Sequence, residues 1–295
     1  MKSINNKVIR AIMLDKSRST RANLSLTNFI ILGNTWIFCR SLLPSALLMG
    51  IVVTLTALTT RFLTGSAALA VWLGCALVTL YFYSTFIYGF ARLMKHHLDT
   101  ETSLVSPLRG WQEYRSLFPG SLPLFYFNVI IFALSLLFVI GGTMLLRVSP
   151  YLLIPVLLLA LLLCVPFALS QLNMVADDTA SIGSSLKFGF TKCLRHFGST
   201  LLILFIATII FIVLGIIGSL PTLILQWAIA ASDASVAVGD PTDLPPYVHG
   251  LSFFFIIFAT AFATLSTLYG WIAGFLHIHS VFAKERDRLN RQDKR

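Results

Sequence analysis

Residues 122–173 read LPLFYFNVIIFALSLLFVIGGTMLLRVSPYLLIPVLLLALLLCVPFALSQLN. The only charged side chain in this stretch is Arg147, which lies between two apolar runs. Each run, Leu122–Leu146 and Tyr151–Asn173, is long enough for a helix to cross the hydrocarbon core, which takes about 20 residues. The stretch therefore predicts a helical hairpin that crosses a membrane twice.

The rest of the chain has the same character. Of its 295 residues, 57% are hydrophobic and 12% are charged, and the mean hydropathy is +0.84. Soluble domains carry about 25% charged residues. Disordered chains need low hydrophobicity and high charge. Both classes are excluded, and a polytopic membrane protein remains.

Four further apolar segments bring the number of predicted spans to six. None of the six segments contains Lys, Arg, Asp or Glu. The predicted fold is therefore all-α, a polytopic transmembrane bundle. The four further spans are Leu42–Thr60, Ser66–Ala91, Ser199–Leu220 and Ser252–Ala283.

Basic residues alternate with the spans. The net charge is +10, and 20 of the 22 Lys and Arg residues lie in segments 1–41, 92–121, 174–198 and 284–295. Because Lys and Arg accumulate in cytoplasmic loops, we expect both termini in the cytoplasm and the protein in the inner (cytoplasmic) membrane. No zinc-finger or other nucleic-acid motif is present, so the positive charge predicts contact with anionic lipid and not with nucleic acid.

Amphipathic stretches precede the first, third and fifth spans. In the third stretch Leu186, Phe190, Cys193, Leu194 and Phe197 recur at helical spacing with basic residues between them. This pattern is typical of helices that lie flat on a membrane surface. We expect three interfacial helices, and the alternative is that these stretches line a buried groove. The side chains expected to contact anionic lipid are Arg109, Arg115, Lys187, Lys192 and Arg195.

An internal repeat connects the second and third of these stretches. A shift of 79 residues places Asp99 on Asp178, Ser106 on Ser185 and Gly110 on Gly189. The repeat predicts three parallel hairpins, each preceded by an interfacial helix. The expected organisation is a basic cytoplasmic segment at 1–23, a membrane domain at 24–283 with repeats at about 24–91, 99–173 and 178–283, and a basic cytoplasmic tail at 284–295.

The repeated segments SPLRGWQEYRSLFPG (106–120) and SSLKFGFTKCLRHFGS (184–199) each place a glycine and an aromatic residue ahead of an apolar span. In this pattern the chain resembles the membrane domain attached to some glycerophosphodiester phosphodiesterases, and the related YciC-like integral membrane proteins. The first copy, at 27–44, departs from the pattern. The resemblance implies a bacterial six-helix membrane domain. It implies no catalytic residue, because the phosphodiesterase activity of those relatives lies in a separate domain.

Two aspartates stand at matched positions before helical stretches. Asp99 and Asp178 are each followed by Thr, and both are predicted to cap a helix, since an N-cap side chain accepts free backbone N–H groups. The alternative is a cluster of carboxylates, with Asp177 and the histidines, that acts on a lipid headgroup. His277 and His279 are two residues apart and point to different faces of a helix. We predict no catalytic residue, no cofactor and no metal site.

Polar and small residues within the spans predict contacts between helices. Asn128, Gln171 and Asn173 are expected to form hydrogen bonds between helices or to meet lipid headgroups. Small residues share one face of the last span, where helices approach closely. They are predicted to pack within the bundle, with self-association or a partner helix as the alternative. These small residues are Ala259, Ala263, Ser266, Gly270 and Gly274.

These features favour an integral membrane protein without recognisable catalytic machinery. The spans contain no acidic or basic residue of the kind that ion-coupled transporters usually need. The leading hypothesis is a scaffold or a lipid-associated factor in envelope maintenance, with membrane lipids or a protein as partner. One alternative is a transporter, or a transport accessory, for a lipid or an uncharged solute. The other is a membrane enzyme that acts on a lipid headgroup.

Overall fold

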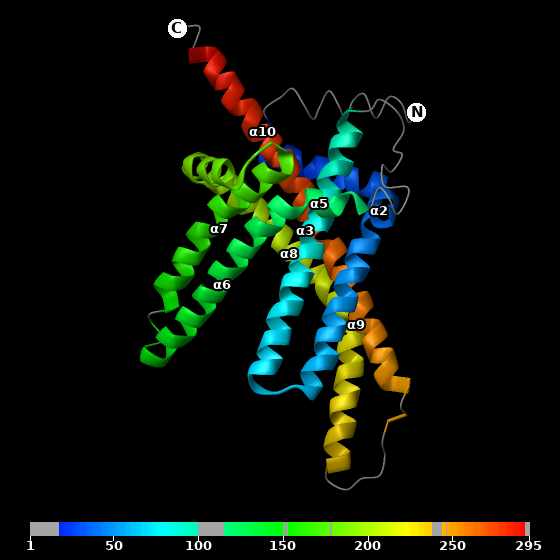
Figure 1. Ribbon diagram of the computed structural model, residues 1–295. Helices are drawn as coiled ribbons and strands as arrows, with labels where there is room; N and C mark the ends of the chain where they lie inside the picture. The colour runs from blue at the N-terminus through cyan, green and yellow to red at the C-terminus, as the bar shows by residue number, and fades with distance from the viewer. Residues whose placement is uncertain are drawn as a thin grey trace.

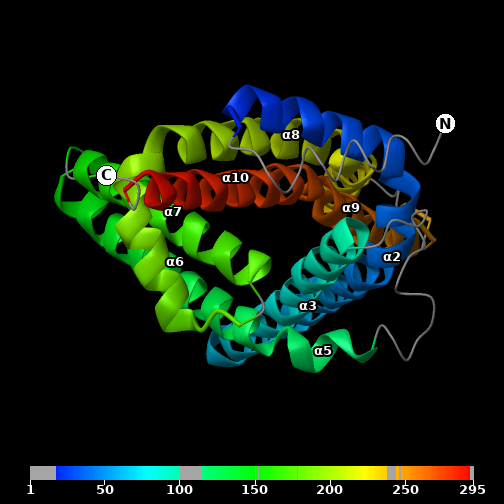
Figure 2. The same cartoon turned by 90° about the horizontal axis from the view of Figure 1, so that it is seen from above.

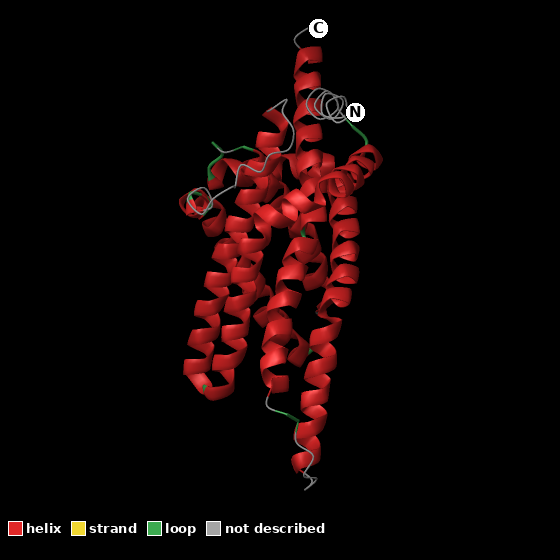
Figure 3. Cartoon of the chain, turned by 90° about the vertical axis from the view of Figure 1, so that its right-hand side faces the viewer, coloured by secondary structure: helices red, strands yellow, loops and turns green. Residues whose placement is uncertain are grey.

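The protein is described from a computed structural model at residues 18–99, 115–149, 151, 153–177, 179–237, 244–245 and 247–292. Within these residues all regular structure is helical and no strand is present (Figure 3). Six helical stretches are long and apolar enough to cross a membrane, which confirms the all-α class and the six predicted spans. They are Trp36–Thr59, Gly65–Lys95, Leu122–Arg147, Leu153–Ala176, Ile182–Ala237 and Tyr247–Arg288.

Eight helices follow one another in the described residues. They are α2 (Thr20–Phe62), α3 (Gly65–Asp99), α5 (Leu117–Gly120), α6 (Leu122–Val148), α7 (Leu153–Ala176), α8 (Ile182–Ala237), α9 (Tyr247–Ser266) and α10 (Leu268–Gln292). In Figure 1 the start of α2 and the end of α10 lie at the same end of the bundle. The helix pairs α2–α3 and α6–α7 meet at that end and separate toward the other.

Two helices are longer than the spans predicted within them. Helix α2 begins after Ser19, whose side chain accepts a hydrogen bond from the Ala22 N–H, and it continues through Pro44. Helix α8 continues past the predicted end of the fifth span at Leu220 and through Pro221. A proline removes one backbone donor, but the apolar residues that follow Pro221 prolong the helix. Figure 2 shows the first part of α8 at an angle to the remainder.

The predicted last span is divided into two helices. Helix α9 ends at Ser266, and α10 begins at Leu268. Between them the Thr267 N–H donates to the Thr264 carbonyl at 3.1 Å, and the Thr267 hydroxyl donates to the same oxygen at 2.7 Å. This contact with the third residue back tightens the chain into a turn. The turn places Gly270 and its neighbours on a separate helix from Ala259 and Ala263.

The buried apolar core lies where α2, α3, α7 and α10 meet. Its largest fully buried side chains include Phe86 and Phe90 of α3 and Phe275 of α10, and the ring centroids of Phe90 and Phe275 are 6.2 Å apart. In contrast, many apolar side chains of α6, α7 and α8 are exposed. This distribution is typical of a protein whose outer surface faces lipid, because there the apolar surface need not be buried within the protein.

Candidate functional site

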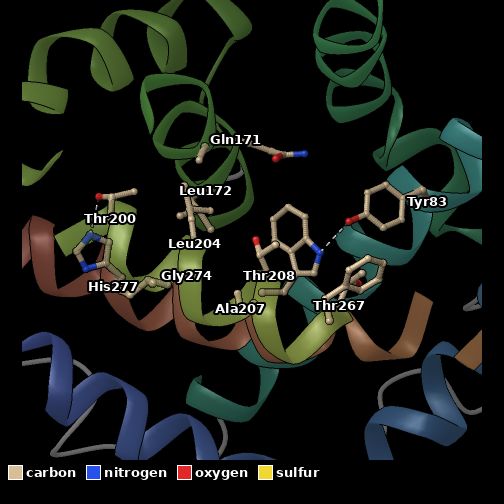
Figure 4. A pocket seen from close by; sticks show the side chains of 15 residues that line it. Tyr83, Gln171, Leu172, Thr200, Leu204, Ala207, Thr208, Thr267, Gly274 and His277 are labelled. Atoms are coloured by element: carbon tan, nitrogen blue, oxygen red, sulfur yellow. Dashed lines mark hydrogen bonds between the residues drawn. The ribbon is translucent and has the colours of Figure 1, made fainter. Parts of the chain in front are cut away.

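A central cavity of about 210 Å³ lies between α3, α7, α8 and α10 (Figure 4). Most of its wall is apolar, formed by side chains such as Leu172 of α7 and Leu204 of α8. Gly270 and Gly274 of α10 also line it, and their lack of a side chain lets α10 approach α8 and α7 closely. The cavity is therefore built from helices that are far apart in the sequence.

Polar side chains lie at two ends of this cavity. Thr200 Oγ1 and His277 Nε2 are 3.0 Å apart in a hydrogen bond at one end. At the other end Trp271 Nε1 donates to the Tyr83 hydroxyl at 3.3 Å. Figure 4 shows Leu172 and Leu204 between Thr200 and Tyr83. A ligand in this space would meet an apolar centre with hydrogen-bonding groups at both ends.

A chain of hydrogen bonds runs from the cavity wall through the bundle. Gln171, which lines the cavity, donates through Nε2 to Asn128 Oδ1 at 2.7 Å. Asn128 in turn donates through Nδ2 to Ser84 Oγ at 2.8 Å. This connects α7, α6 and α3 and confirms the predicted hydrogen bonds of Asn128 and Gln171 between helices. Asn173 behaves likewise, since its Nδ2 donates to Ser185 Oγ of α8 at 3.1 Å.

Two wider grooves adjoin the central cavity. Tyr83 also lines a groove of about 570 Å³ between α2, α3 and α6. Gln171 also lines a groove of about 500 Å³ between α6, α7 and α8. Both grooves are walled mainly by apolar side chains. Tyr83 and Gln171 therefore stand where the central cavity meets the apolar grooves at its sides.

A charged cluster lies beyond the Thr200 end of the cavity. Lys192 Nζ is 2.6 Å from Glu285 Oε2, and Arg195 Nη1 is 2.5 Å from Glu285 Oε1. His196 Nε2 lies 3.7 Å from Glu285 Oε1, which is too long for a hydrogen bond. The cluster connects the first part of α8 to the second half of α10. His196 precedes Thr200 by four residues, a rise of about 6 Å along a helix.

The predicted lipid contacts and caps have different surroundings. Arg109 and Asp178 lie outside the described residues, and Arg115 and Lys187 are exposed. Lys192 and Arg195 are the pair held by Glu285. Asp99 is the last residue of α3. The start of α8 is capped by a residue that sequence reasoning missed, Ser181, whose Oγ accepts from the Ser184 N–H at 3.2 Å.

The Asp177 carboxylate accepts hydrogen bonds within its own turn. Its Oδ1 accepts from the Thr179 hydroxyl at 2.7 Å and from the Thr179 N–H at 2.9 Å. The hydrogen bond from the Thr179 hydroxyl, and then the one from its N–H, lower the pKa of Asp177, because both favour the ionised carboxylate. The described contacts of Asp177 are thus local, and its carboxylate is exposed.

The two histidines of the last span have different neighbours, as their spacing predicts. His277 lines the cavity, whereas His279 packs against the ring of Phe275, with centroids 4.6 Å apart. Within the part of the chain that the structure describes, no group of three His, Cys, Asp or Glu residues could hold a metal ion.

The predicted small-residue face is turned partly toward the bundle. A Cβ atom built on Gly274 would lie 2.6 Å from Leu172 Cδ2, and one on Gly270 would lie 3.1 Å from Ala207 Cβ. Ser266 is buried, while Ala259 and Ala263 are half-buried. Gly270 and Gly274 therefore give α10 its close approach to α8 and α7.

Sequence reasoning identified Gln171 but missed Tyr83, Thr200 and Trp271 as members of one site. Each is an unremarked polar or aromatic residue in a separate apolar span, so no local pattern connects them. Comparisons of the chain with protein-family models, with curated proteins and with solved structures find no match. The geometry of the cavity and of the charged cluster is therefore the basis for the function proposed below.

Proposed function

We propose that this integral membrane protein binds a membrane lipid in the central cavity and acts as a lipid-associated factor in envelope maintenance. One observation carries the proposal. The cavity between α3, α7, α8 and α10 has an apolar centre and polar ends, and it adjoins two apolar grooves. A cluster of basic side chains lies beyond its Thr200 end.

The apolar lining favours a lipid over a small polar solute. The cavity of about 210 Å³ is smaller than the sites of about 300–1,000 Å³ that hold drug-sized molecules, so a lipid would have to extend from it into the adjoining grooves. The adjoining grooves of about 570 and 500 Å³ are apolar and suit acyl chains. Lipids consist of long apolar chains below a polar headgroup, which matches the order of grooves, cavity and basic cluster.

The same proposal includes the position of the protein in the membrane. The distribution of Lys and Arg supports an inner-membrane protein with both termini in the cytoplasm. The basic, amphipathic first parts of α2 and α8 would then lie at the cytoplasmic surface as interfacial helices, and the 79-residue repeat would relate parallel hairpins. Membership of the group that the sequence resembles remains a prediction.

Lipid analysis of the purified protein tests the proposal. The wild-type chain and two variants are extracted into native lipid discs, and the lipids that co-purify are quantified by mass spectrometry. Ala168→Phe fills the cavity, because Ala168 lines it. Ala230→Phe is the matched control, the same substitution at an exposed position of α8. Thermal unfolding of each variant checks that both fold.

We expect Ala168→Phe to retain about tenfold less of one lipid class, the ratio that corresponds to about 1.4 kcal/mol of binding free energy. Ala230→Phe should retain as much as the wild type. Equal lipid profiles in all three proteins would contradict the proposal. A specific protein partner, retained equally by both variants, would favour the scaffold hypothesis instead.

Transport of a lipid or an uncharged solute is the second candidate. The hydrogen-bonded chain Ser84–Asn128–Gln171 reaches the cavity from the middle of the bundle and offers polar groups to a passing molecule. Liposomes that contain the protein and a fluorescent lipid distinguish the two functions. Accelerated exchange of the lipid between leaflets, abolished by Ala168→Phe, would favour transport over binding.

A further inference from the structure

We propose that Lys192, Arg195 and His196 form a binding site for a phosphate group, and that the Glu285 carboxylate is an internal competitor for that site. The proposal deepens the function above by naming the headgroup that the protein recognises. It rests on that function only where the phosphate belongs to a lipid.

The three side chains share one face of α8. They stand at positions i, i+3 and i+4, which are neighbours on a helix. Lys192 contacts one oxygen of Glu285 at 2.6 Å, and Arg195 contacts the other at 2.5 Å. Both carboxylate oxygens are therefore engaged, and each cation holds one of them.

His196 Nε2 makes no hydrogen bond in this arrangement. The His196 side chain is only 8% exposed, and Nε2 has no hydrogen-bond partner. Burial of such a polar atom without a hydrogen bond is costly. This nitrogen lies 3.7 Å from Oε1 of the same carboxylate, beyond hydrogen-bond distance.

A phosphate group fits this set of donors better than a carboxylate does. It carries about −1.5 to −2 charges as a monoester and has three strong acceptor oxygens. Two oxygens can take the places of the Glu285 oxygens, and a third can accept from His196 Nε2–H. Two cations also balance the charge of a phosphate monoester, whereas they exceed that of one carboxylate.

The site can be reached from outside the protein. The side chains of Lys192 and Arg195 are 29% and 48% exposed, and that of Glu285 is 18% exposed. Displacement of Glu285 would break the two ion pairs that join α10 to α8 there. The site also lies about one helical turn beyond Thr200 and the cavity, within reach of a lipid headgroup.

The test compares two neutralising substitutions on α10. Glu285→Gln removes the competitor, and Asp287→Asn removes one negative charge from an exposed position two residues away. Inorganic phosphate is titrated against each protein in discs of phosphatidylcholine, with binding followed by ³¹P NMR line broadening. In a second arm the discs contain phosphatidic acid, and the retained lipid is quantified by mass spectrometry.

We expect Glu285→Gln to bind phosphate about tenfold more tightly than the wild type, a ratio that corresponds to about 1.4 kcal/mol. Asp287→Asn should change binding by less than about twofold, since exposed charges are screened by solvent and salt. Lys192→Gln and Arg195→Gln should each weaken binding in the Glu285→Gln background. Equal effects of Glu285→Gln and Asp287→Asn, or no gain with Glu285→Gln, would overturn the proposal.

The two arms separate the sources of the phosphate and the two proposals. Enrichment of phosphatidic acid over phosphatidylcholine identifies a lipid headgroup, and binding of inorganic phosphate without that enrichment identifies a soluble phosphate. Ala168→Phe should leave the binding of inorganic phosphate unchanged. Failure of the cavity proposal therefore leaves this result intact, and failure of the phosphate site leaves the cavity result intact.

Discussion

Gln171 on α7 donates a hydrogen bond to Asn128 on α6, with 2.7 Å between Nε2 and Oδ1. The two residues are 43 positions apart, and each belongs to a predicted span without charged residues. Asn128 Nδ2 in turn donates a hydrogen bond to Ser84 Oγ on α3 at 2.8 Å. Polar groups in an apolar bundle are satisfied here by one another, and Gln171 is held at the cavity wall as a result.

The first prediction concerns this pair. Gln171→Leu should destabilise the bundle, because Asn128 Oδ1 then loses its donor. We expect a coupling energy between the two positions of about 0.6–1.7 kcal/mol, the range of side-chain hydrogen bonds between membrane helices. A double-mutant cycle of Gln171→Leu and Asn128→Leu, unfolded in denaturing detergent, measures it. Strictly additive effects would show that the pair is uncoupled.

The second prediction concerns Gly189, where α8 lies against α7. A Cβ atom at Gly189 would lie 2.1 Å from Ser170 Oγ and 2.3 Å from the Pro166 carbonyl oxygen. The backbone oxygen cannot move aside without shifting α7. Gly189→Ala should therefore lower the free energy of unfolding by about 1–3 kcal/mol, the usual cost of overpacking.

Gly215→Ala is the matched control on the same helix. A Cβ atom there meets nothing within 4 Å. The substitution should leave stability unchanged or raise it by up to about 1 kcal/mol, the helix-propensity difference between Ala and Gly. Both variants are compared by unfolding in denaturing detergent. Equal stability of the two variants would argue against the close α7–α8 contact.

The sequence was sufficient for the spans because their apolar runs are long and uninterrupted. The predicted span Leu122–Leu146 is nearly the observed α6, Leu122–Val148. The turn at Thr267 was not predictable, because it forms where the N–H and hydroxyl of a threonine within an apolar run donate hydrogen bonds to the Thr264 carbonyl. The apolar pattern does not indicate where a turn of this kind divides a helix.

The candidate site was predictable only in part, for a different reason. Asn128 and Gln171 stand out as amides in apolar spans, so their hydrogen bonds could be expected. The pairing of Lys192 with Glu285 joins residues 93 positions apart. It depends on how the first part of α8 lies against α10, which no local pattern encodes. The sequence predicts lipid contact for Lys192 and Arg195 but gives no sign that they also pair with a carboxylate.

The third prediction is a pH dependence at Asp177. Hydrogen bonds from Thr179 lower the pKa of this carboxyl in the folded protein. The stabilisation is therefore present above the ordinary pKa of an aspartate and is lost as the pH falls through the lowered value. Thr179→Val keeps the backbone N–H and removes the hydroxyl, so the pKa of Asp177 should move up toward its usual range.

Carboxyl ¹³C NMR, titrated with pH on protein labelled at aspartate, measures this change. The signal of Asp177 is assigned by its loss in Asp177→Asn. Thr191→Val serves as the control, because the Thr191 hydroxyl donates to the Lys187 carbonyl and not to a carboxylate. An unchanged Asp177 titration in Thr179→Val would show that the hydroxyl makes no contribution.

The fourth prediction concerns Gly50, where α2 crosses α9. A Cβ atom on Gly50 would lie 2.6 Å from the carbonyl oxygen of Ile257 and 3.0 Å from its Cα. Both are backbone atoms of α9, so no side-chain rotation relieves the contact. Gly50→Ala should therefore separate the two helices and destabilise the protein by about 1–3 kcal/mol.

The same substitution at Gly33, also on α2, is the control, since nothing lies within 4 Å of a Cβ atom there. Cysteines placed at Val53 and Phe253, in a background without the four native cysteines, report the approach of α2 to α9 through the rate of disulfide formation. That rate should fall in Gly50→Ala and stay unchanged in Gly33→Ala. If the rate falls equally in both variants, the substitutions act on α2 as a whole, and the prediction of a close crossing at Gly50 is wrong.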